Sequence, residues 1–438
     1  MKTFLKILFG VQIVLALSLF VLTALHIKPV VAYTITYISS SVVFIATSIM
    51  ILKYDVTLKY VFGLVAVGII LRIAFMPVHP IGSDDYYRYV WDGKVQANGI
   101  NPYEYSANDK ALESLHTETL PKLINYADMK TIYPPLSQII FYASYLIGGD
   151  GFIGLKILLL FFELFTMLGI FLILKKLNLN YKYLLLYALC PLPIFQFFID
   201  AHVDGFGLVF IIFSIFFYID NKKILSYIFI GLSICIKPLG LIFIPIMFFN
   251  EKGFASRIKT FLIPALLCVL LYLPYVFTGS PFQALMKFTE NWTFNGVIFD
   301  ILDSFIHDNQ RTRLLCGILL FIFYIPVIFS KKDLFDKIYL SIFLLFIFSP
   351  IVHPWYLGWL AVLLPFIQRR SGIVYAGLVS LTAFTVLNYQ LTGVWKEYNV
   401  VLVFEYLPVI FLFVLELITN NRILKGTSSN KDLSAELL

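Results

Sequence analysis

Long apolar runs recur along this sequence. Most have the length of a membrane-spanning helix, about 20 residues, and they lack the strict alternation of barrel strands. Backbone groups in hydrocarbon need hydrogen-bond partners within their own segment, which a helix supplies. The pattern therefore predicts an all-α polytopic membrane protein with spans near residues 4–25, 33–52, 59–76, 152–174, 182–199, 203–219, 260–277, 312–330, 337–350, 355–367, 371–388 and 400–419.

Two further apolar segments are interrupted by proline. Residues 132–149 begin with Pro134 and Pro135, and residues 224–249 contain Pro238 directly after Lys237. Proline has no N–H and cannot continue a helix cleanly, so the first segment is predicted to be a re-entrant or interfacial helix. The second is predicted to form two short arms that meet near the outer face. In total the sequence predicts about 12–14 transmembrane helices.

Charged residues predict the orientation of these spans. Residues 77–131 are too polar for the bilayer and form the first large outer loop if the N-terminus is cytoplasmic. Every short loop on the opposite side is then basic, as the positive-inside rule requires. We expect one transmembrane domain, residues 1–424, in a bacterial inner membrane, with a cytoplasmic tail at 425–438. The inner basic residues are Lys53, Lys59, Lys175, Lys176, Lys182, Lys222, Lys223, Lys252, Arg257, Lys259, Lys331, Lys332, Lys337, Arg369 and Arg370.

Composition agrees with a protein dissolved in lipid. Hydrophobic residues make up 60% of the 438 residues and charged residues only 13%, more apolar surface than a soluble core of this size hides. The net charge of +7 is spread over short loops rather than gathered in a basic domain, so we expect no nucleic-acid partner. The four cysteines fall in apolar runs, and no disulfide is expected.

Ionisable residues gather on the predicted outer face, where the topology brings them from five separate places. Such groups near a bilayer are costly, and several at one depth typically line a water-filled cavity or a ligand site. The alternative for each one is a solvated loop residue. The set comprises Asp84 and Asp85, His202 with Asp204, Lys237, Asp300 with Asp303, and the run His353-Pro354-Trp355-Tyr356.

The acidic pair precedes a predicted helix in the first outer loop. Ser83 is placed to cap a helix that begins near Asp84 and stops before Gly99. One face of this helix would carry Arg88 and further polar groups, and another, with Trp91 and Val95, would lie on lipid. The two acids either stabilise the helix start through its dipole, or supply a general base assisted by a second carboxylate.

This loop carries a family resemblance. The run Ser-Asp-Asp-Tyr-Tyr-Arg-Tyr-Val-Trp-Asp-Gly, then Gly-Ile-Asn-Pro-Tyr and Thr-Ile-Tyr-Pro-Pro-Leu-Ser-Gln, resembles bacterial polyprenol-phosphate-mannose-dependent mannosyltransferases of the GT-C superfamily. The likeness is close over residues 80–140, and Lys237-Pro238 and His353-Pro354-Trp355-Tyr356 are similar to later features of that family. It implies a glycosyltransferase that moves a hexose, mannose in that family, from a polyprenyl-phosphate donor to a glycan or lipid-linked acceptor outside the cytoplasm.

The resemblance also assigns expected roles. Asp85 or Asp84 would take the proton of the acceptor hydroxyl as the sugar–phosphate bond breaks. Lys237 and His353 would meet the donor phosphate, and Arg88 would either touch phosphate or pair with Asp85 or Asp92. The further candidates for substrate contact are Tyr133, Trp355, Tyr356, His202 and Asp204.

Some alternatives remain open from the residues alone. A transporter or flippase of a lipid-linked sugar would also have many spans and a broken helix, and a non-catalytic assembly subunit is a third hypothesis. His202 and Asp204 could join the acidic pair in holding a divalent metal, but their spacing is a weak signal, so we expect no metal and no cofactor. Glu163 lies mid-span with no obvious partner.

Overall fold

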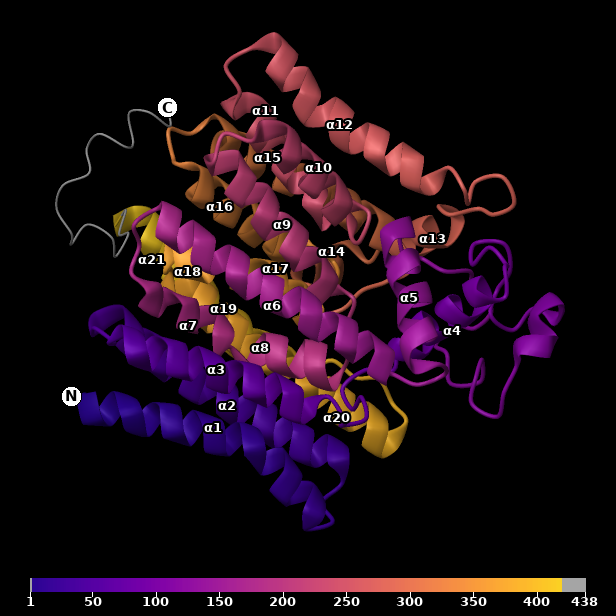
Figure 1. Ribbon diagram of the computed structural model, residues 1–438, viewed down its shortest axis with the longest axis horizontal. Helices are drawn as coiled ribbons and strands as arrows, with labels where there is room; N and C mark the ends of the chain where they lie inside the picture. The colour runs from indigo at the N-terminus through magenta and orange to yellow at the C-terminus, as the bar shows by residue number, and fades with distance from the viewer. Residues whose placement is uncertain (1, 420–438) are drawn as a thin grey trace.

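The computed structural model describes residues 2–419, so the predicted tail at 425–438 lies outside the described part of the chain. The described residues are helical and contain no β-strand, only an isolated bridge between Phe294 and Ile351. This confirms the all-α prediction. In Figure 1 the start of α1 lies on the left and the α4–α5 region on the right, so these parts occupy opposite ends of the molecule. Which end faces the cytoplasm stays a prediction.

The first three helices are long and apolar. They are α1 (Lys2–Ala24), α2 (Pro29–Lys53) and α3 (Leu58–Phe75), and α1 packs along α2 at the edge of the bundle (Figure 1). Their bounds agree with the predicted spans within a few residues. Pro29 starts α2, as expected for a residue whose missing N–H costs nothing in the first turn.

The polar stretch after α3 folds into short helices. They are α4 (Tyr86–Ala97), the 3-10 turn η1 (Lys110–Leu115) and α5 (Pro135–Gly148). Helix α4 packs against α5, and α5 packs against α6. The Pro134-Pro135 pair determines where α5 starts, because Pro134 is extended and Pro135 occupies the first turn. Its 14 residues agree with the prediction of a helix too short to cross a bilayer.

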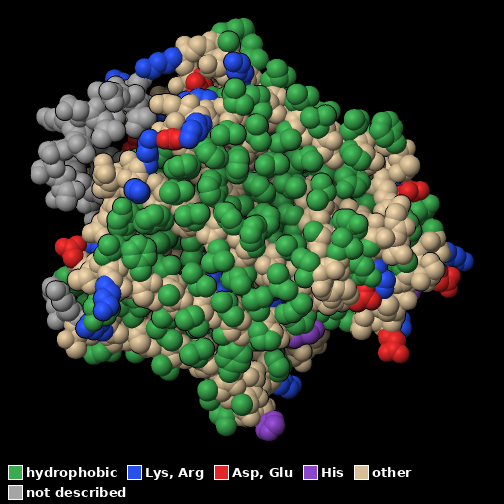
Figure 2. Space-filling model, in the orientation of Figure 1, with side chains coloured by type: hydrophobic (Ala, Val, Ile, Leu, Met, Phe, Trp, Pro, Cys, Tyr) green, Lys and Arg blue, Asp and Glu red, His purple; other side chains and the backbone are tan. Residues whose placement is uncertain are grey.

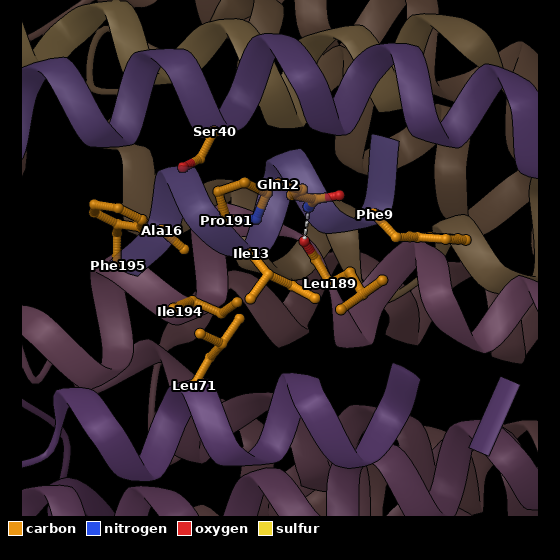
Figure 3. A pocket seen from close by; sticks show the side chains of 10 residues that line it. All are labelled: Phe9, Gln12, Ile13, Ala16, Ser40, Leu71, Leu189, Pro191, Ile194 and Phe195. Carbon is orange, nitrogen blue, oxygen red and sulfur yellow. Dashed lines mark hydrogen bonds between the residues drawn. The ribbon is translucent and has the colours of Figure 1, made fainter. Parts of the chain in front are cut away.

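Helix α6 (Ile153–Lys176) is followed by a broken element rather than the continuous span predicted at 182–199. This element consists of η2 (Tyr181–Leu184), α7 (Leu185–Ala188), α8 (Pro191–Pro193) and the π-helical turn η3 (Ile194–Ile199), and it bends by 43°. Proline causes the break: Pro193 cannot donate to the carbonyl of Leu189. Instead, Gln12 Nε2 from α1 donates to that carbonyl at 2.6 Å (Figure 3).

A buried ion pair supports the same break and supplies Glu163 with the partner that the sequence did not reveal. Arg72 Nε lies 3.0 Å from Glu163 Oε2, and both side chains are fully buried. Arg72 Nη1 also donates to the carbonyl of Ala188 at 2.8 Å. Tyr187 donates its hydroxyl to the other oxygen of Glu163. Ionised groups are tolerated inside a membrane bundle when they pair in this way.

The middle of the chain contains the second predicted break. Helix α9 (Asp204–Ile219) is followed by α10 (Lys223–Ile234), η4 (Pro238–Ile242) and α11 (Phe243–Asn250). The chain between α10 and η4 is extended at Lys237, so the prediction of two short arms meeting at Lys237-Pro238 is confirmed.

After α11, the described part of the chain contains four helices of at least 15 residues, separated by shorter elements and loops. The predicted span at 355–367 is wrong as a continuous helix: it consists of three short pieces with a break at residues 362–363, and Pro365 in the first turn of the last piece has no N–H to continue the preceding helix. The elements are α12 (Phe254–Tyr272), α13 (Gln283–Asn291), α14 (Val297–Ile306), α15 (Asn309–Phe329), α16 (Leu334–Phe348), η5 (Pro354–Leu357), α17 (Gly358–Ala361), α18 (Leu364–Ile367), α19 (Arg370–Leu378), η6 (Val379–Thr382), α20 (Ala383–Thr392) and α21 (Asn399–Thr419).

Eight described helices are long and apolar enough to cross a membrane, or up to nine with the bent pair at Tyr181–Ile199. The predicted 12–14 counted the short helix α9 as a full span and included the two short arms that correspond to α10 and α11. Those helices are apolar but short, because breaks at turns and prolines end them early. On the face in Figure 2 hydrophobic side chains cover the middle and charged side chains lie near the edges, as expected for an integral membrane protein.

Candidate active site

A cavity of about 860 Å³ opens where the loop at residues 77–131 meets α13, α20 and the breaks in the bundle. Eight of the ten residues predicted from the sequence line it. The other two, His202 and Asp204, are fully buried directly behind this lining. The eight lining residues are Asp84, Asp85, Arg88, Tyr133, Lys237, His353, Trp355 and Tyr356.

The backbone just before the acidic pair is anchored by a buried aspartate. Asp200 Oδ1 accepts hydrogen bonds from the backbone N–H groups of Gly82 at 2.7 Å and Ile81 at 3.1 Å. Its other oxygen accepts the hydroxyl of Tyr33 at 2.6 Å. A Cβ on Gly82 would lie 2.5 Å from Asp200 Oδ2, so only glycine permits this close approach. The anchor places Asp84 and Asp85 at the cavity wall.

The two acids have different surroundings. Asp84 accepts a hydrogen bond from the side chain of Asn125, and burial raises its pKa. Burial and the neighbouring charge of Asp84 raise the pKa of Asp85 to about 7, although the charge of Lys237 opposes the rise. A carboxylate that is half ionised near neutral pH is suited to accept a proton.

Asp85 occupies the N-cap position of α4, so its charge lies at the helix start, but its side chain does not act through a capping hydrogen bond. Helix α4 begins at Tyr86, two residues later than predicted, and Asp85 makes no side-chain capping hydrogen bond. Ser83 Oγ accepts from the backbone N–H of Asp85 at 3.2 Å. The carboxylates are therefore left to face the cavity.

Lys237 points into the protein and not toward lipid. Its Nζ lies 2.8 Å and 2.7 Å from the two carboxylate oxygens of Asp204 and 3.7 Å from the centre of the Tyr356 ring. Trp359 Nε1 donates a third hydrogen bond to Asp204 at 3.1 Å. The Lys237 side chain keeps 17% of its surface exposed at the cavity, so a ligand in the cavity can reach it.

The break in the helix carrying Lys237 is completed by α5. The backbone N–H of Leu136 donates to the carbonyl of Cys235 at 3.1 Å, and Ser137 Oγ donates to the carbonyl of Ile236 at 2.9 Å. These carbonyls have no helical partner because Pro238 ends the hydrogen-bond pattern. The two proline-marked segments predicted separately therefore meet and hold Lys237 in place.

His353 and Trp355 belong to a stack of four rings. The ring centroids are 3.5 Å apart for His202 and Trp355, 4.3 Å for Trp355 and His353, and 4.7 Å for His353 and Phe294. His202 Nδ1 lies 3.9 Å from Asp85 Oδ2, beyond hydrogen-bond distance. Burial and the charge of Lys237 lower the pKa of His353 to about 3, so this imidazole is neutral.

Arg88 pairs with neither of the predicted acids. Its Nη2 donates to the backbone carbonyls of Tyr126 at 2.9 Å and Met129 at 3.1 Å, which fastens the end of the 77–131 loop to α4. The predicted lipid-facing side of α4 is also wrong. Trp91 and Val95 are buried, because the loop around η1 folds over them and His116 packs on Trp91.

Tyr133 approaches the acidic pair through a neighbouring tyrosine. Its hydroxyl lies 3.5 Å from that of Tyr89, which lies 3.5 Å from His202 Nδ1. The backbone carbonyl of Tyr133 accepts the hydroxyl of Tyr103 at 2.6 Å. This network connects the Thr-Ile-Tyr-Pro-Pro segment to α4.

No group of three or more His, Cys, Asp or Glu side chains gathers as a metal site in residues 2–419. The carboxylate of Asp204, one candidate ligand, already accepts hydrogen bonds from Lys237 and Trp359. Asp303, predicted on the same face, lies outside the lining and accepts a hydrogen bond from Thr312 at 2.8 Å. That the protein needs no metal and no cofactor stays a prediction.

Several supporting residues could not be recognised from the sequence. Asp200 lies at the end of an apparently apolar span and was therefore not selected as a candidate. Its position two residues before the candidate His202 could have indicated that it belongs to the site. Asn295 adopts a left-handed conformation with a φ of 54°. Its side chain donates to the buried Glu405 at 3.1 Å and its carbonyl accepts from Tyr406 at 2.8 Å. These contacts hold the neighbouring Phe294 against His353.

The helical membrane fold and this cavity define a polytopic membrane protein with a candidate active site at one end of the helical bundle. Comparison with known families gives a match to the model described as Alpha-(1->6)-mannopyranosyltransferase, N-terminal domain, over residues 11–250. This region is more than half of the chain and contains Asp85, His202, Asp204 and Lys237. The chain belongs to this mannosyltransferase family. No curated protein matches the chain.

Proposed function

We propose that this mannosyltransferase takes mannose from a polyprenyl-phosphate donor and transfers it to an acceptor hydroxyl on the non-cytoplasmic side of the membrane. The observation that carries the proposal is a single cavity whose lining contains both the carboxylate of Asp85 and the cation Lys237. Displacement at an anomeric carbon requires both a proton acceptor and a cation for the leaving phosphate. The acceptor is a glycan or a lipid-linked sugar.

Asp85 acts as the general base in this proposal. The acceptor oxygen forms a bond to the anomeric carbon while the bond from that carbon to the phosphate oxygen breaks. The hydroxyl proton passes to Asp85, and the electron pair leaves with the polyprenyl phosphate. A pKa of about 7 supports this role, because it combines a useful ionised fraction with enough basicity.

Lys237 and His353 receive the donor phosphate. Lys237 is held by Asp204 and Tyr356 yet remains partly exposed, so a phosphate oxygen can share its ammonium group without moving it. The neutral imidazole of His353 supplies an N–H donor. A preorganised site of this kind stabilises the charge that develops on the leaving group.

The proposed side of the membrane follows from the loop charges. Every short loop opposite the 77–131 loop is basic, which favours a cytoplasmic position for those loops. The cavity then faces away from the cytosol, where nucleotide sugars are made. A donor anchored in the membrane by its polyprenyl chain would be available on that side.

The proposal is tested with the full-length protein reconstituted in vesicles. We expect radiolabelled mannose to pass from polyprenyl-phosphate mannose, and not from GDP-mannose, to an α-mannoside acceptor. Transfer from the nucleotide sugar alone would overturn the donor assignment. Movement of the intact lipid across the bilayer without transfer would instead support the transporter hypothesis.

The role of Lys237 needs a variant that still folds, because removing one member of a buried ion pair costs about 3–5 kcal/mol. We therefore compare Lys237→Met with the double substitution Lys237→Met/Asp204→Asn, which leaves no unpaired charge. The donor KM should rise about tenfold or more in both. If the double variant recovers the normal donor KM, Lys237 has only a structural role. Lys122→Met, on the exposed outer loop, is the control.

A further inference from the structure

Four aromatic side chains line the part of the cavity that is open to solvent, and we call them the aromatic mouth: Tyr126, Trp292, Tyr389 and Trp395. Tyr126 is 55% exposed, Trp395 49% and Tyr389 42%. They come from the outer loop, from the segment after α13, and from α20 with the loop that follows it. An interfacial aromatic belt would face outward onto lipid, whereas these rings face the cavity.

The ring geometry of the mouth differs from that of the inner stack. Tyr126 and Trp292 meet at 71° with centroids 4.3 Å apart, and Tyr389 and Trp395 meet at 67° with centroids 5.8 Å apart. An edge contact leaves ring faces uncovered. The rings from His202 to Phe294 are nearly parallel and cover one another. Trp292 also packs against Phe288 at 5.2 Å, and Trp395 packs against Phe294 at 5.4 Å. The ring surface that the mouth offers to a ligand therefore comes mainly from Tyr126, Tyr389 and Trp395, which are 42–55% exposed.

The backbone beneath the Tyr126 ring is held rigidly. Tyr126 has a φ of 53°, a conformation that is costly for a bulky residue and that concentrates at functional sites. Arg88 holds its carbonyl at 2.9 Å, and the preceding Asn125 is bonded to Asp84. An exposed ring on a strained, fixed backbone is preorganised to bind.

The other sides of the mouth are held in the same way. Arg313 donates to the backbone carbonyl of Trp292, and also to that of Thr289 at 2.7 Å. Gln390, next to Tyr389, donates to the carbonyl of Ile81 at 2.5 Å. The aromatic mouth is thus tied to the same loop that carries Asp84 and Asp85, so a ligand on these rings has a defined position relative to the acids.

The lining around the rings contains neutral polar side chains together with apolar ones such as Phe288 and Val386, and with Lys130. Asn291, Thr293 and Gln390 line the cavity beside the aromatic residues, and Arg88 is engaged by backbone carbonyls. A pyranose ring presents an apolar C–H face and a rim of hydroxyl groups, which match an aromatic face flanked by amides and hydroxyls. A prenyl chain would leave these polar groups without partners.

We propose that the aromatic mouth binds the acceptor as a neutral oligosaccharide and holds the sugars adjacent to the one that reacts. The inference rests on the proposed function in one respect, that the reacting hydroxyl reaches Asp85. The terminal sugar then enters the inner cavity while the following sugars lie on the rings of the mouth. The enzyme should consequently prefer longer acceptors.

The test compares a short and a long acceptor with the full-length enzyme and polyprenyl-phosphate mannose. The probes are methyl α-mannopyranoside and an α-(1->6)-linked mannotriose. Trp292→Ala should raise the KM for mannotriose about tenfold, the effect of one lost aromatic contact, and leave the KM for the methyl mannoside unchanged. Trp292→Phe should restore part of the preference. Tyr142→Ala, an exposed ring on α5 outside the cavity, is the matched control.

Equilibrium binding of radiolabelled mannotriose without any donor separates this inference from the donor assignment. We expect saturable binding that weakens about tenfold in Trp292→Ala and Tyr126→Ala. If mannotriose binds in this way but no mannose moves from the lipid donor, the donor proposal fails and the acceptor site stands. The inference is overturned if mannotriose does not bind the wild-type enzyme, or if both acceptors lose activity equally in Trp292→Ala.

Discussion

The two ends of the cavity are built on different physical principles. At the inner end, His202, Asp204 and Lys237 are buried or nearly so, and a charged pair with two close N–O contacts holds them. At the aromatic mouth the side chains are neutral, three are exposed and Trp292 is half-buried, and hydrogen bonds hold the backbone beneath Tyr126 and Trp292. The inner end holds charged groups in fixed positions, whereas the mouth offers neutral aromatic surface to a ligand.

The two ends also come from different parts of the chain. All the inner residues just named lie within the matched region 11–250, whereas three of the four mouth residues lie beyond it. A buried charge must keep its partner or lose several kcal/mol, so the inner end tolerates little change. Replacing an exposed aromatic ring leaves no buried charge without a partner, so it does not carry this cost.

The largest effect is expected at the inner end. Asp85→Asn removes the proton acceptor and should lower the rate of mannosyl transfer by about 100- to 10,000-fold. Binding of the donor and of mannotriose should persist, because neither depends on the ionised carboxylate. Initial rates with labelled donor at saturating acceptor measure this. If Asp85→Asn remains active while Asp84→Asn does not, the base is Asp84.

A smaller effect is expected from disturbing the anchor of the acidic loop. In Gly82→Ala the new Cβ would meet Asp200 Oδ2 at 2.5 Å and the Tyr33 hydroxyl at 2.6 Å. We expect a loss of about 1–3 kcal/mol in stability and a reduced kcat as the acids shift. Melting temperature and turnover are measured together. Gly63→Ala on α3, where no atom lies within 4 Å of the new Cβ, should change neither quantity.

The smallest effect is a shift in pH dependence. Because the ionised form of Asp85 is required, kcat/KM should rise with pH to a midpoint near 7 and level off above it. The charge of Asp84 raises the pKa of Asp85, so Asp84→Asn should move the midpoint down by roughly one pH unit. Glu118→Gln, an exposed acid on the same loop, should leave the midpoint in place. If the midpoint does not move in Asp84→Asn, the charge of Asp84 does not raise the pKa of Asp85.

Much of the fold was predictable because membranes impose simple rules. A run of apolar residues long enough to cross the bilayer predicted α2 and α6 well, and proline predicted the break at Lys237 and the start of α5. The same rules failed at 182–199, where the run was apolar but Pro191 and Pro193 interrupt the helix. The partners that make this break tolerable, Gln12 and Arg72, are far away in the sequence and could not be foreseen.

The sequence predicted which residues belong to the candidate site better than it predicted which partners those residues contact. The sequence pattern selected Asp85, Lys237 and His353, and the structure brings them to one cavity. It could not indicate that Arg88 would hold Tyr126 in place, because guanidinium groups bond to whatever acceptor the fold presents. The lipid-facing role predicted for Trp91 failed for a related reason, since the loop that covers it has no apolar pattern.

The sequence alone determined that this protein is a helical membrane protein with an acidic motif of mannosyltransferase type, because hydrophobic length, proline and charge act locally. Only the tertiary structure decided how the cavity is built. Asp200 reaches back to Gly82, Glu405 holds Asn295, and four aromatic rings from three segments converge on one mouth. These contacts join residues far apart in the chain, and such pairings depend on how the helices pack.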